Sequence, residues 1–205
     1  MKISRSLLFV SPIIVLSTVA FAQPGAIPAP LNPGVLSDSY QIQVLTNGSA
    51  VQQSNAFITN AGELGASATP SANIGNICVN MYTFGAQQQE IRCCSCLVPP
   101  NGLVQVTLNE ASTTGEELVV KLIATIPGTS TAAAGTNAGP FTGTVCNAAA
   151  TFTTANLAPG MRAWLSPSTF SAASPFQSAN LSSGELTKLT SVCASPAGVC
   201  PVCSH

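Results

Sequence analysis

Eight cysteines constrain the fold of this chain more than any other feature. Three of them occupy four consecutive positions in the segment EIRCCSCLV, residues 90–98. The full set is Cys78, Cys93, Cys94, Cys96, Cys146, Cys193, Cys200 and Cys203. In an exported chain an even number of cysteines predicts a disulfide framework, here of up to four bridges. Eight cysteines can pair in 105 ways, so their spacing alone leaves the connectivity open.

The N-terminus is typical of a secretory signal peptide. Lys2 and Arg5 precede a long uncharged apolar run, and Ala20-Phe21-Ala22 supplies the small residues that signal peptidase reads. We therefore expect residues 1–22 to be removed. The apolar run is broken by Pro12 and is too short to span a bilayer. The chain is predicted to be exported, to the periplasm or the medium, with no membrane span after cleavage.

The charge content argues against several kinds of partner. Only 6% of the residues are charged, against roughly 25% in ordinary soluble domains. Beyond the predicted signal peptide, four basic side chains stand against seven acidic ones, and no basic patch is available to hold phosphates. Nucleic acid is therefore not an expected partner. A surface with so little charge repels its own copies weakly, which favours self-association or contact with an envelope or polysaccharide.

The sequence offers no arrangement typical of catalysis. His205 is the only histidine and Asp38 the only aspartate, and each lies near one end of the mature chain. A Ser-His-Asp triad would then need its base on a frayed terminus. Glu116 and Glu117 are adjacent, and neighbours on a strand point to opposite faces. With no phosphate-binding loop or zinc-protease motif either, we expect a non-enzymatic structural or binding protein of the extracellular space or the envelope, without a cofactor.

The chain is expected to form one mainly β domain. Residues 23–38 contain four prolines and are predicted to be an extended leader, followed by a single domain over residues 39–205. Several short strands separated by turns predict an antiparallel β-sandwich stabilised by disulfides. A C-terminal helix over residues 182–193 is favoured by a serine cap and by an apolar stripe at helical spacing.

The strongest strand signals lie in the middle of the chain. Strands are expected at 77–84, 88–98, 103–109 and 117–126, and weaker ones at 145–154 and 161–166. Asn47-Gly48 between two β-favouring runs predicts a two-residue hairpin, and Gly85-Ala86 predicts a second one.

The second hairpin suggests one disulfide. Pairing Phe84 with Gln87 places Cys78 opposite Cys93, so we expect these two cysteines to be bonded. Cys94 and Cys96 are then expected to share the other face of the strand, because side chains alternate. Cys94 and Cys96 are expected to bond with two of Cys146, Cys193, Cys200 and Cys203. These bonds would tie the helix and the tail to the sheet.

Two other chemistries remain open for the same cysteines. Cys94, Cys96, Cys200 and Cys203 could form a four-cysteine zinc site, although C-x-C is shorter than the usual spacing. Alternatively, CPVC at residues 200–203 resembles a thiol-redox motif. That motif needs a helix after its first cysteine, whereas only two residues follow here. We expect disulfides and no bound metal.

The few aromatic and basic residues suggest one further type of site. Trp164, with Tyr82 and Phe84, could form a platform for a sugar in a carbohydrate-binding module. A single tryptophan is more often used in core packing or turn anchoring, which is the role that we expect. Arg92 and Arg162 are expected to be solvated or paired with a glutamate.

Five segments together resemble a family of exported bacterial proteins of unknown function. They are NICVNMYTF, QEIRCCSCLVPPNGL, ELVVKLIAT, CNAAATF with LAPGMRAW, and LSSGELTKLTSVC with GVCPVC. The resemblance covers most of residues 76–203, and its most specific part is C-C-x-C followed by a Pro-x-Asn-Gly turn. In the family a longer Gly-rich loop precedes the last C-x-x-C, where this chain has the short ASPAGV. The resemblance implies export from a bacterium and assigns no activity.

Overall fold

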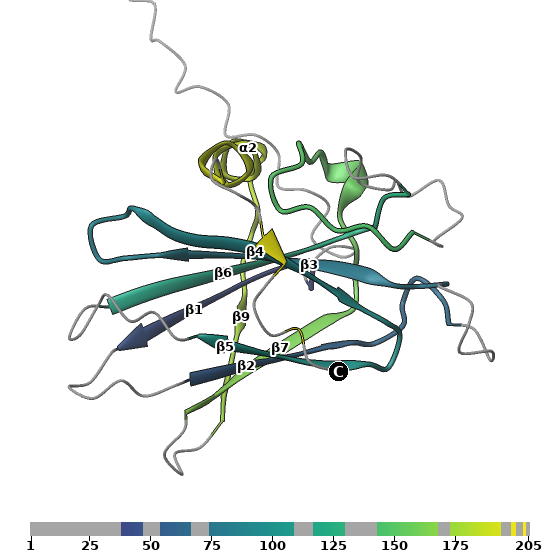
Figure 1. Cartoon of the computed structure of the whole chain (residues 1–205), viewed down its shortest axis with the longest axis horizontal. Coiled ribbons are helices and arrows are strands. Elements are labelled where there is room, and N and C mark those ends of the chain that lie inside the picture. The colour runs from purple at the N-terminus through teal and green to yellow at the C-terminus, as the bar shows by residue number, and fades with distance from the viewer. Residues whose placement is uncertain are drawn as a thin grey trace, which may run out of the picture.

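The chain folds as a two-sheet β-sandwich with one helix packed on the outside of the larger sheet (Figure 1). The computed structural model describes residues 38–46, 54–66, 74–108, 117–129, 143–167, 173–193, 198–199 and 203. The predicted signal peptide, most of the proline-rich leader and Cys200 lie outside these residues. The predicted fold class, an antiparallel sandwich with a short C-terminal helix and disulfides, is confirmed.

Six strands form the larger sheet in the order β10-β4-β3-β6-β1-β9, and four form the smaller sheet in the order β5-β2-β7-β8. Neighbouring strands are antiparallel except for the short pair β10 and β4. The strands are β1 Tyr40–Thr46, β2 Ser54–Asn60, β3 Ile77–Phe84, β4 Glu90–Val98, β5 Leu103–Leu108, β6 Glu117–Thr125, β7 Met161–Pro167, β8 Ser174–Pro175, β9 Gln177–Ser178 and β10 Gly198–Val199. The helical elements are a 3-10 turn η1, Thr154–Asn156, and the helix α2, Ser183–Val192.

The larger sheet is covered on both faces, so the molecule has two hydrophobic cores. One core fills the sandwich and includes Ile58, Met81 and Leu122, each almost fully buried. The other lies on the outer face of the larger sheet, where Tyr82 and Ile123 pack against Leu186 of the helix. Every residue of β3 is buried for this reason, which explains why its sequence shows no apolar–polar alternation.

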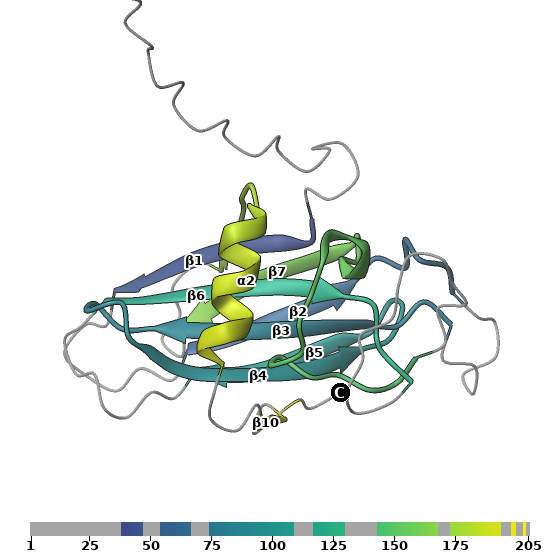
Figure 2. The same ribbon diagram turned by 90° about the horizontal axis from the view of Figure 1, so that it is seen from above.

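Helix α2 lies across the strands of the larger sheet (Figure 2). Ser182 caps it, because the serine side chain accepts a hydrogen bond from the backbone N–H of Glu185 at 3.1 Å. Leu186 and Leu189 form the buried stripe that the sequence predicts. In the part of the chain that the structure describes, no helix is long and apolar enough to cross a membrane.

Five of the six strand predictions agree with the structure, and one is wrong. β3, β4, β5, β6 and β7 lie where strands are expected, with ends that differ by a few residues. The expected strand at 145–154 is instead an isolated bridge at Val145, a turn at residues 148–149 and the beginning of η1. Asn147 and Asn156 cap these turns through their side-chain oxygens, and such local hydrogen bonds compete with strand formation.

One of the two predicted hairpins lies outside the described residues, and the geometry predicted for the other is wrong. The Asn47-Gly48 turn and the run that follows it, residues 49–53, lie outside the described residues. The next described strand, β2, belongs to the smaller sheet, whereas β1 belongs to the larger one. The second connection has five residues, Gly85 to Gln89, so Phe84 pairs with Glu90 rather than with Gln87. Gln88 adopts a left-handed backbone conformation there (φ 64°), which is uncommon for a residue with a side chain.

The longer hairpin changes the disulfide pairing. Cys78 lies opposite Leu97, and Cys93 lies opposite Tyr82, so the predicted Cys78–Cys93 bond is wrong. The structure instead contains the disulfides Cys78–Cys146, Cys93–Cys193 and Cys96–Cys203. Cys94 is disulfide-bonded as well. The second of these bonds ties the C-terminal end of α2 to β4.

Candidate functional site

Of the four cysteines considered for a zinc or redox site, Cys94, Cys96 and Cys203 are disulfide-bonded, and Cys200 lies outside the described residues. Cys94 and Cys96 are each 2% exposed in the sandwich core, and Cys203 is bonded to Cys96. A disulfide sulfur is not a thiolate, and the thiolate is the form that binds zinc or attacks a disulfide. The disulfides also indicate an oxidising compartment, extracellular or periplasmic.

One further group of metal-ligand types lies among the described residues. A carboxylate oxygen of Glu90 is within 4.8 Å of the sulfurs of Cys93 and Cys193, but these sulfurs are bonded to each other. Burial raises the pKa of the Glu90 carboxyl, and one of its oxygens is buried without a hydrogen-bond partner. The group is therefore a carboxyl beside a disulfide and offers no cluster of metal-binding thiolates.

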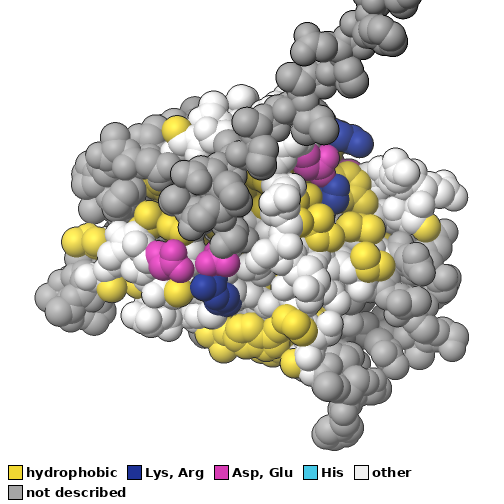
Figure 3. All heavy atoms as spheres, turned by 180° about the vertical axis from the view of Figure 1, so that it is seen from behind, with side chains coloured by type: hydrophobic (Ala, Val, Ile, Leu, Met, Phe, Trp, Pro, Cys, Tyr) yellow, Lys and Arg dark blue, Asp and Glu magenta, His cyan; other side chains and the backbone are white. Residues whose placement is uncertain are grey.

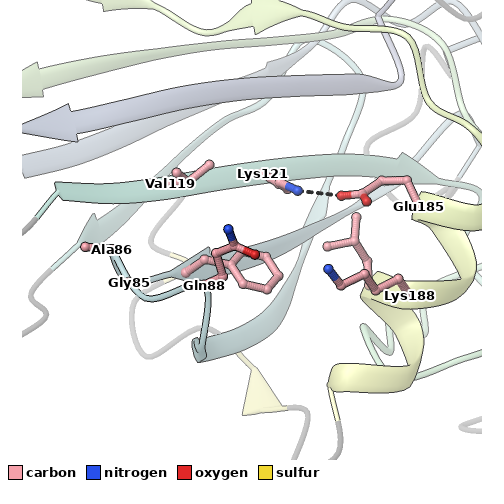
Figure 4. Close-up of a pocket in the computed structure, with 9 residues that line it drawn as sticks. Gly85, Ala86, Gln88, Val119, Lys121, Glu185 and Lys188 are labelled. Atoms are coloured by element: carbon pink, nitrogen blue, oxygen red, sulfur yellow. Dashed lines mark hydrogen bonds and ion pairs between the residues drawn. The ribbon is translucent and has the colours of Figure 1, made fainter.

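Among the described residues, a recess lies between α2, β6 and the β3–β4 hairpin (Figure 4). Its volume is about 360 Å³, within the range of small-molecule sites. The hairpin contributes Phe84, Gly85, Ala86 and Gln88, β6 contributes Val119 and Lys121, and α2 contributes Glu185, Lys188 and Leu189. We call this recess the helix pocket.

An ion pair connects two walls of the helix pocket. Lys121 Nζ donates to Glu185 Oε1 at 2.5 Å, and the same ammonium lies 5.2 Å from the centre of the Phe84 ring. Tyr40 donates a second hydrogen bond to the Glu185 carboxylate. The pKa of the Tyr40 phenol is raised well above its usual value, mainly because the phenol is buried and also because this carboxylate is close. Glu185 is therefore held by a lysine and a tyrosine that stays protonated.

The helix pocket is supported by the fold around it. Ser182 fixes the first turn of α2, which carries Glu185, and the Cys93–Cys193 disulfide fixes the other end. The hairpin wall is held by hydrogen bonds from the backbone N–H of Gly85 to Gln89 O and from that of Gln88 to Gly85 O. A methyl group at Gly85 would lie 2.6 Å from the end of the Gln89 side chain, which is flexible and can move aside. Both walls are thus formed before any ligand arrives.

Sequence reasoning did not find this site. Its residues come from three separate segments, and Lys121, Glu185 and Lys188 form no recognisable spacing. The available signal was the scarcity of charge, because two of the four basic residues beyond the predicted signal peptide line one recess.

The three aromatic residues proposed for a sugar platform do not lie together, because they belong to different sheets. Tyr82 and Phe84 are buried in the outer core, as expected. Trp164 is only partly buried on the outer face of the smaller sheet, so its predicted role in core packing is wrong. There it stacks on Phe57, with ring centres 5.8 Å apart and planes 14° apart. The two rings pair directly across β2 and β7.

The two predicted arginines have different partners. Arg162 forms ion pairs with Asp38 and Glu63, which agrees with the expectation of acidic partners. Arg92 donates a hydrogen bond to the backbone carbonyl of Thr107 at 3.3 Å. In Figure 3, charged side chains gather at two separate places on the face shown, a first group towards the lower left and a second group towards the upper right. A hydrophobic patch lies beside the first group.

No protein-family model, curated protein or solved structure matches the chain.

Proposed function

We propose that this chain is a non-enzymatic, exported binding domain and that its ligand occupies the helix pocket. The observation that carries the proposal is a preformed cavity of about 360 Å³ whose lining combines apolar side chains with two lysines and a glutamate. Pockets of this size with a few placed polar groups are the usual form of small-molecule sites. We also propose that the chain belongs to the exported bacterial family that its cysteine motifs resemble.

A binding role fits the chemistry better than a catalytic one. Glu185 is engaged with Lys121 and Tyr40 and has no nucleophile beside it in the described pocket lining. General acid–base or covalent catalysis needs a titrating group within hydrogen-bond reach of a reacting atom or nucleophile. The pocket side chains can orient and neutralise a ligand, which is what a binding protein requires.

Filling the helix pocket is expected to weaken binding without unfolding the protein. Val119 lines the pocket and is only partly buried, so Val119→Trp places a large ring in the cavity. NMR titration with toluene, benzamide, benzoate and benzylamine should show at least one fragment shifting the signals of Phe84 and Leu189. Val119→Trp should weaken that fragment by about tenfold or more, since its space is occupied.

The matched control is Leu103→Trp, which adds the same ring at a residue that is 47% exposed on the other sheet. This variant should bind as the unaltered protein does. If no fragment of any charge shifts the pocket signals, or if Val119→Trp binds normally, the helix pocket is not the ligand site.

The outer face of the smaller sheet supports a second candidate function, that of a carbohydrate-binding module. The Phe57–Trp164 stack leaves aromatic surface exposed, and Gln105 lies directly opposite Phe57 on the same face. Asn55 and Thr107, also on this face, are hydrogen-bonded to each other at 3.1 Å. Sugars use their C–H faces against aromatic rings and their hydroxyls against amides, so this face has both kinds of group.

Replacing the tryptophan tests this second candidate. Trp164→Ala should weaken retention on cellulose, chitin or xylan in affinity electrophoresis by about tenfold, because the stacking surface is lost. Leu103→Ala, on the same face but away from the stack, should be retained normally. If neither the unaltered protein nor Leu103→Ala is retained, the face does not bind these sugars. If Trp164→Ala changes only the sedimentation coefficient, the face binds other copies of the chain and not sugars.

A further inference from the structure

Positive charge is concentrated at the helix pocket. Beyond the predicted signal peptide the chain has only four basic residues, Arg92, Lys121, Arg162 and Lys188. Arg162 is held by two acidic side chains, and Arg92 is bonded to the edge of the smaller sheet. The other two line one cavity. In a chain with so few charges, this places half of the available cations around a single recess.

The two lysines differ in how their charge is satisfied. Lys121 is neutralised by Glu185 at 2.5 Å. Among the residues that the structure describes, no acidic side chain forms an ion pair with Lys188. Figure 4 shows Lys188 extending from α2 towards the hairpin, on the same side of the helix as Glu185. The pocket therefore has a net charge of about one positive unit, located at the Lys188 ammonium.

The remaining lining sets the shape of a ligand. Phe84, Val119 and Leu189 provide apolar surface on the three walls. At about 30 Å³ for each water-sized group, a cavity of about 360 Å³ holds roughly a dozen such groups. A ligand of this size can bury an apolar body against these side chains and still reach the lysine at the rim.

We propose that the helix pocket binds a small organic monoanion, a carboxylate with a compact apolar or aromatic body. The carboxylate pairs with Lys188, and the body packs between Phe84, Val119 and Leu189. Glu185 adds selectivity, because its fixed negative charge neutralises Lys121 and repels the second charge of a dianion such as a phosphate monoester. This inference rests on the proposed function, since it names the ligand class of the same pocket.

The test compares four aromatic probes of similar size on the mature, oxidised protein. Benzoate is the monoanion, phenylphosphate the dianion, benzamide the neutral isostere and benzylamine the cation. Titration followed by NMR at Phe84 and Leu189 should rank benzoate above benzamide and benzylamine weakest. A neutral or cationic probe that binds best in the pocket would overturn the ligand class while leaving the proposed binding function intact. No binding by any probe would remove both.

Two variants assign the charge effect to named residues. Lys188→Gln should weaken benzoate by about three- to tenfold and leave benzamide unchanged, because only the ionic attraction is removed. Lys188→Arg should keep most of the affinity. Arg162→Gln, which removes one positive charge outside the pocket lining, is the matched control and should bind benzoate normally. Equal weakening by Lys188→Gln and Arg162→Gln would show a general charge effect and overturn the assignment.

Removing the glutamate should reverse the preference between anions. Glu185→Gln frees Lys121 and raises the pocket charge by one unit, and a dianion gains about twice as much from this change as a monoanion. The ratio of phenylphosphate to benzoate affinity should rise by about five- to tenfold. An unchanged or lower ratio would contradict the selective role of Glu185.

Discussion

Removal of the Cys93–Cys193 disulfide, by replacing both cysteines with alanine, is expected to lower the free energy of unfolding by about 4–5 kcal/mol. The two cysteines are 100 residues apart in the sequence, and a bond that closes so long a loop strongly restricts the unfolded chain. Both residues are buried, so alanine avoids placing an unpaired hydroxyl in the outer core. Urea unfolding of the variant and of the oxidised parent measures the difference.

The same change should also impair the helix pocket, because the bond holds one end of α2 against β4. The matched control is the pair Cys96→Ala and Cys203→Ala, whose bond closes a similar loop with a separation of 107. Both double variants should lose similar stability. Only the first should lose benzoate affinity when both are measured without denaturant. If binding survives in the first and is lost in the second, α2 is not fixed by Cys93–Cys193.

Thiol and metal content check the premise of this prediction. The described cysteines are all bonded, so the native protein should show no reactive thiol among them and should carry no zinc. Chelators should leave the urea midpoint unchanged, whereas reducing agents should lower it. One equivalent of zinc in protein recovered from the exported fraction would instead support a four-cysteine site at Cys94, Cys96, Cys200 and Cys203.

The strands were predictable where local pattern and tertiary structure agree. β5 alternates buried and half-exposed residues because one of its faces packs on the sandwich core, and this alternation is visible in LVQVTL. β3 and β6 were found through their β-branched and aromatic content. The helix was found because a serine cap and two buried leucines at helical spacing coincide.

Connections between elements were not predictable from the same signals. An Asn-Gly pair favours a tight turn, but it does not determine which sheet the following strand joins, and here β1 and β2 separate. At the second hairpin the five-residue loop depends on a left-handed Gln88, a conformation that its residue type does not favour. That loop and a β-bulge between Thr83 and Phe84 together shifted the register, and the shift moved Cys93 from Cys78 to Tyr82.

The candidate site was less predictable than the fold. The helix pocket exists because α2 crosses the sheet at one place, and no short motif encodes a crossing between segments about 65 to 100 residues apart. Trp164 shows a related limit, since residue type predicts burial only on average and an outer sheet face can carry an aromatic pair.

Replacing Asn80 with leucine is expected to destabilise the fold by about 3 kcal/mol or more. Asn80 is 0% exposed at the centre of β3, where its amide donates to Ile123 O at 3.2 Å and to Thr125 Oγ1 at 3.0 Å. Its oxygen accepts a hydrogen bond from Ser95 on β4. Leucine would leave two buried hydroxyls without this partner. Urea unfolding measures the loss, and Asn55→Leu, at a half-buried amide with one such bond, should cost less than about 1 kcal/mol.

A triple variant separates a satisfied network from simple crowding. When Ser95→Ala and Thr125→Val are added to Asn80→Leu, the leucine no longer lies beside buried hydroxyls that lack a hydrogen-bond partner. At least half of the lost stability should therefore return. The network also specifies register, because Asn80 pairs with Ser95 across the strands and a slip of one residue would turn the amide into the sandwich core. The triple variant should therefore regain stability and yet refold less uniformly, with additional amide signals in its NMR spectrum. A triple variant that is less stable than Asn80→Leu alone would show that the cost arises from the volume of leucine.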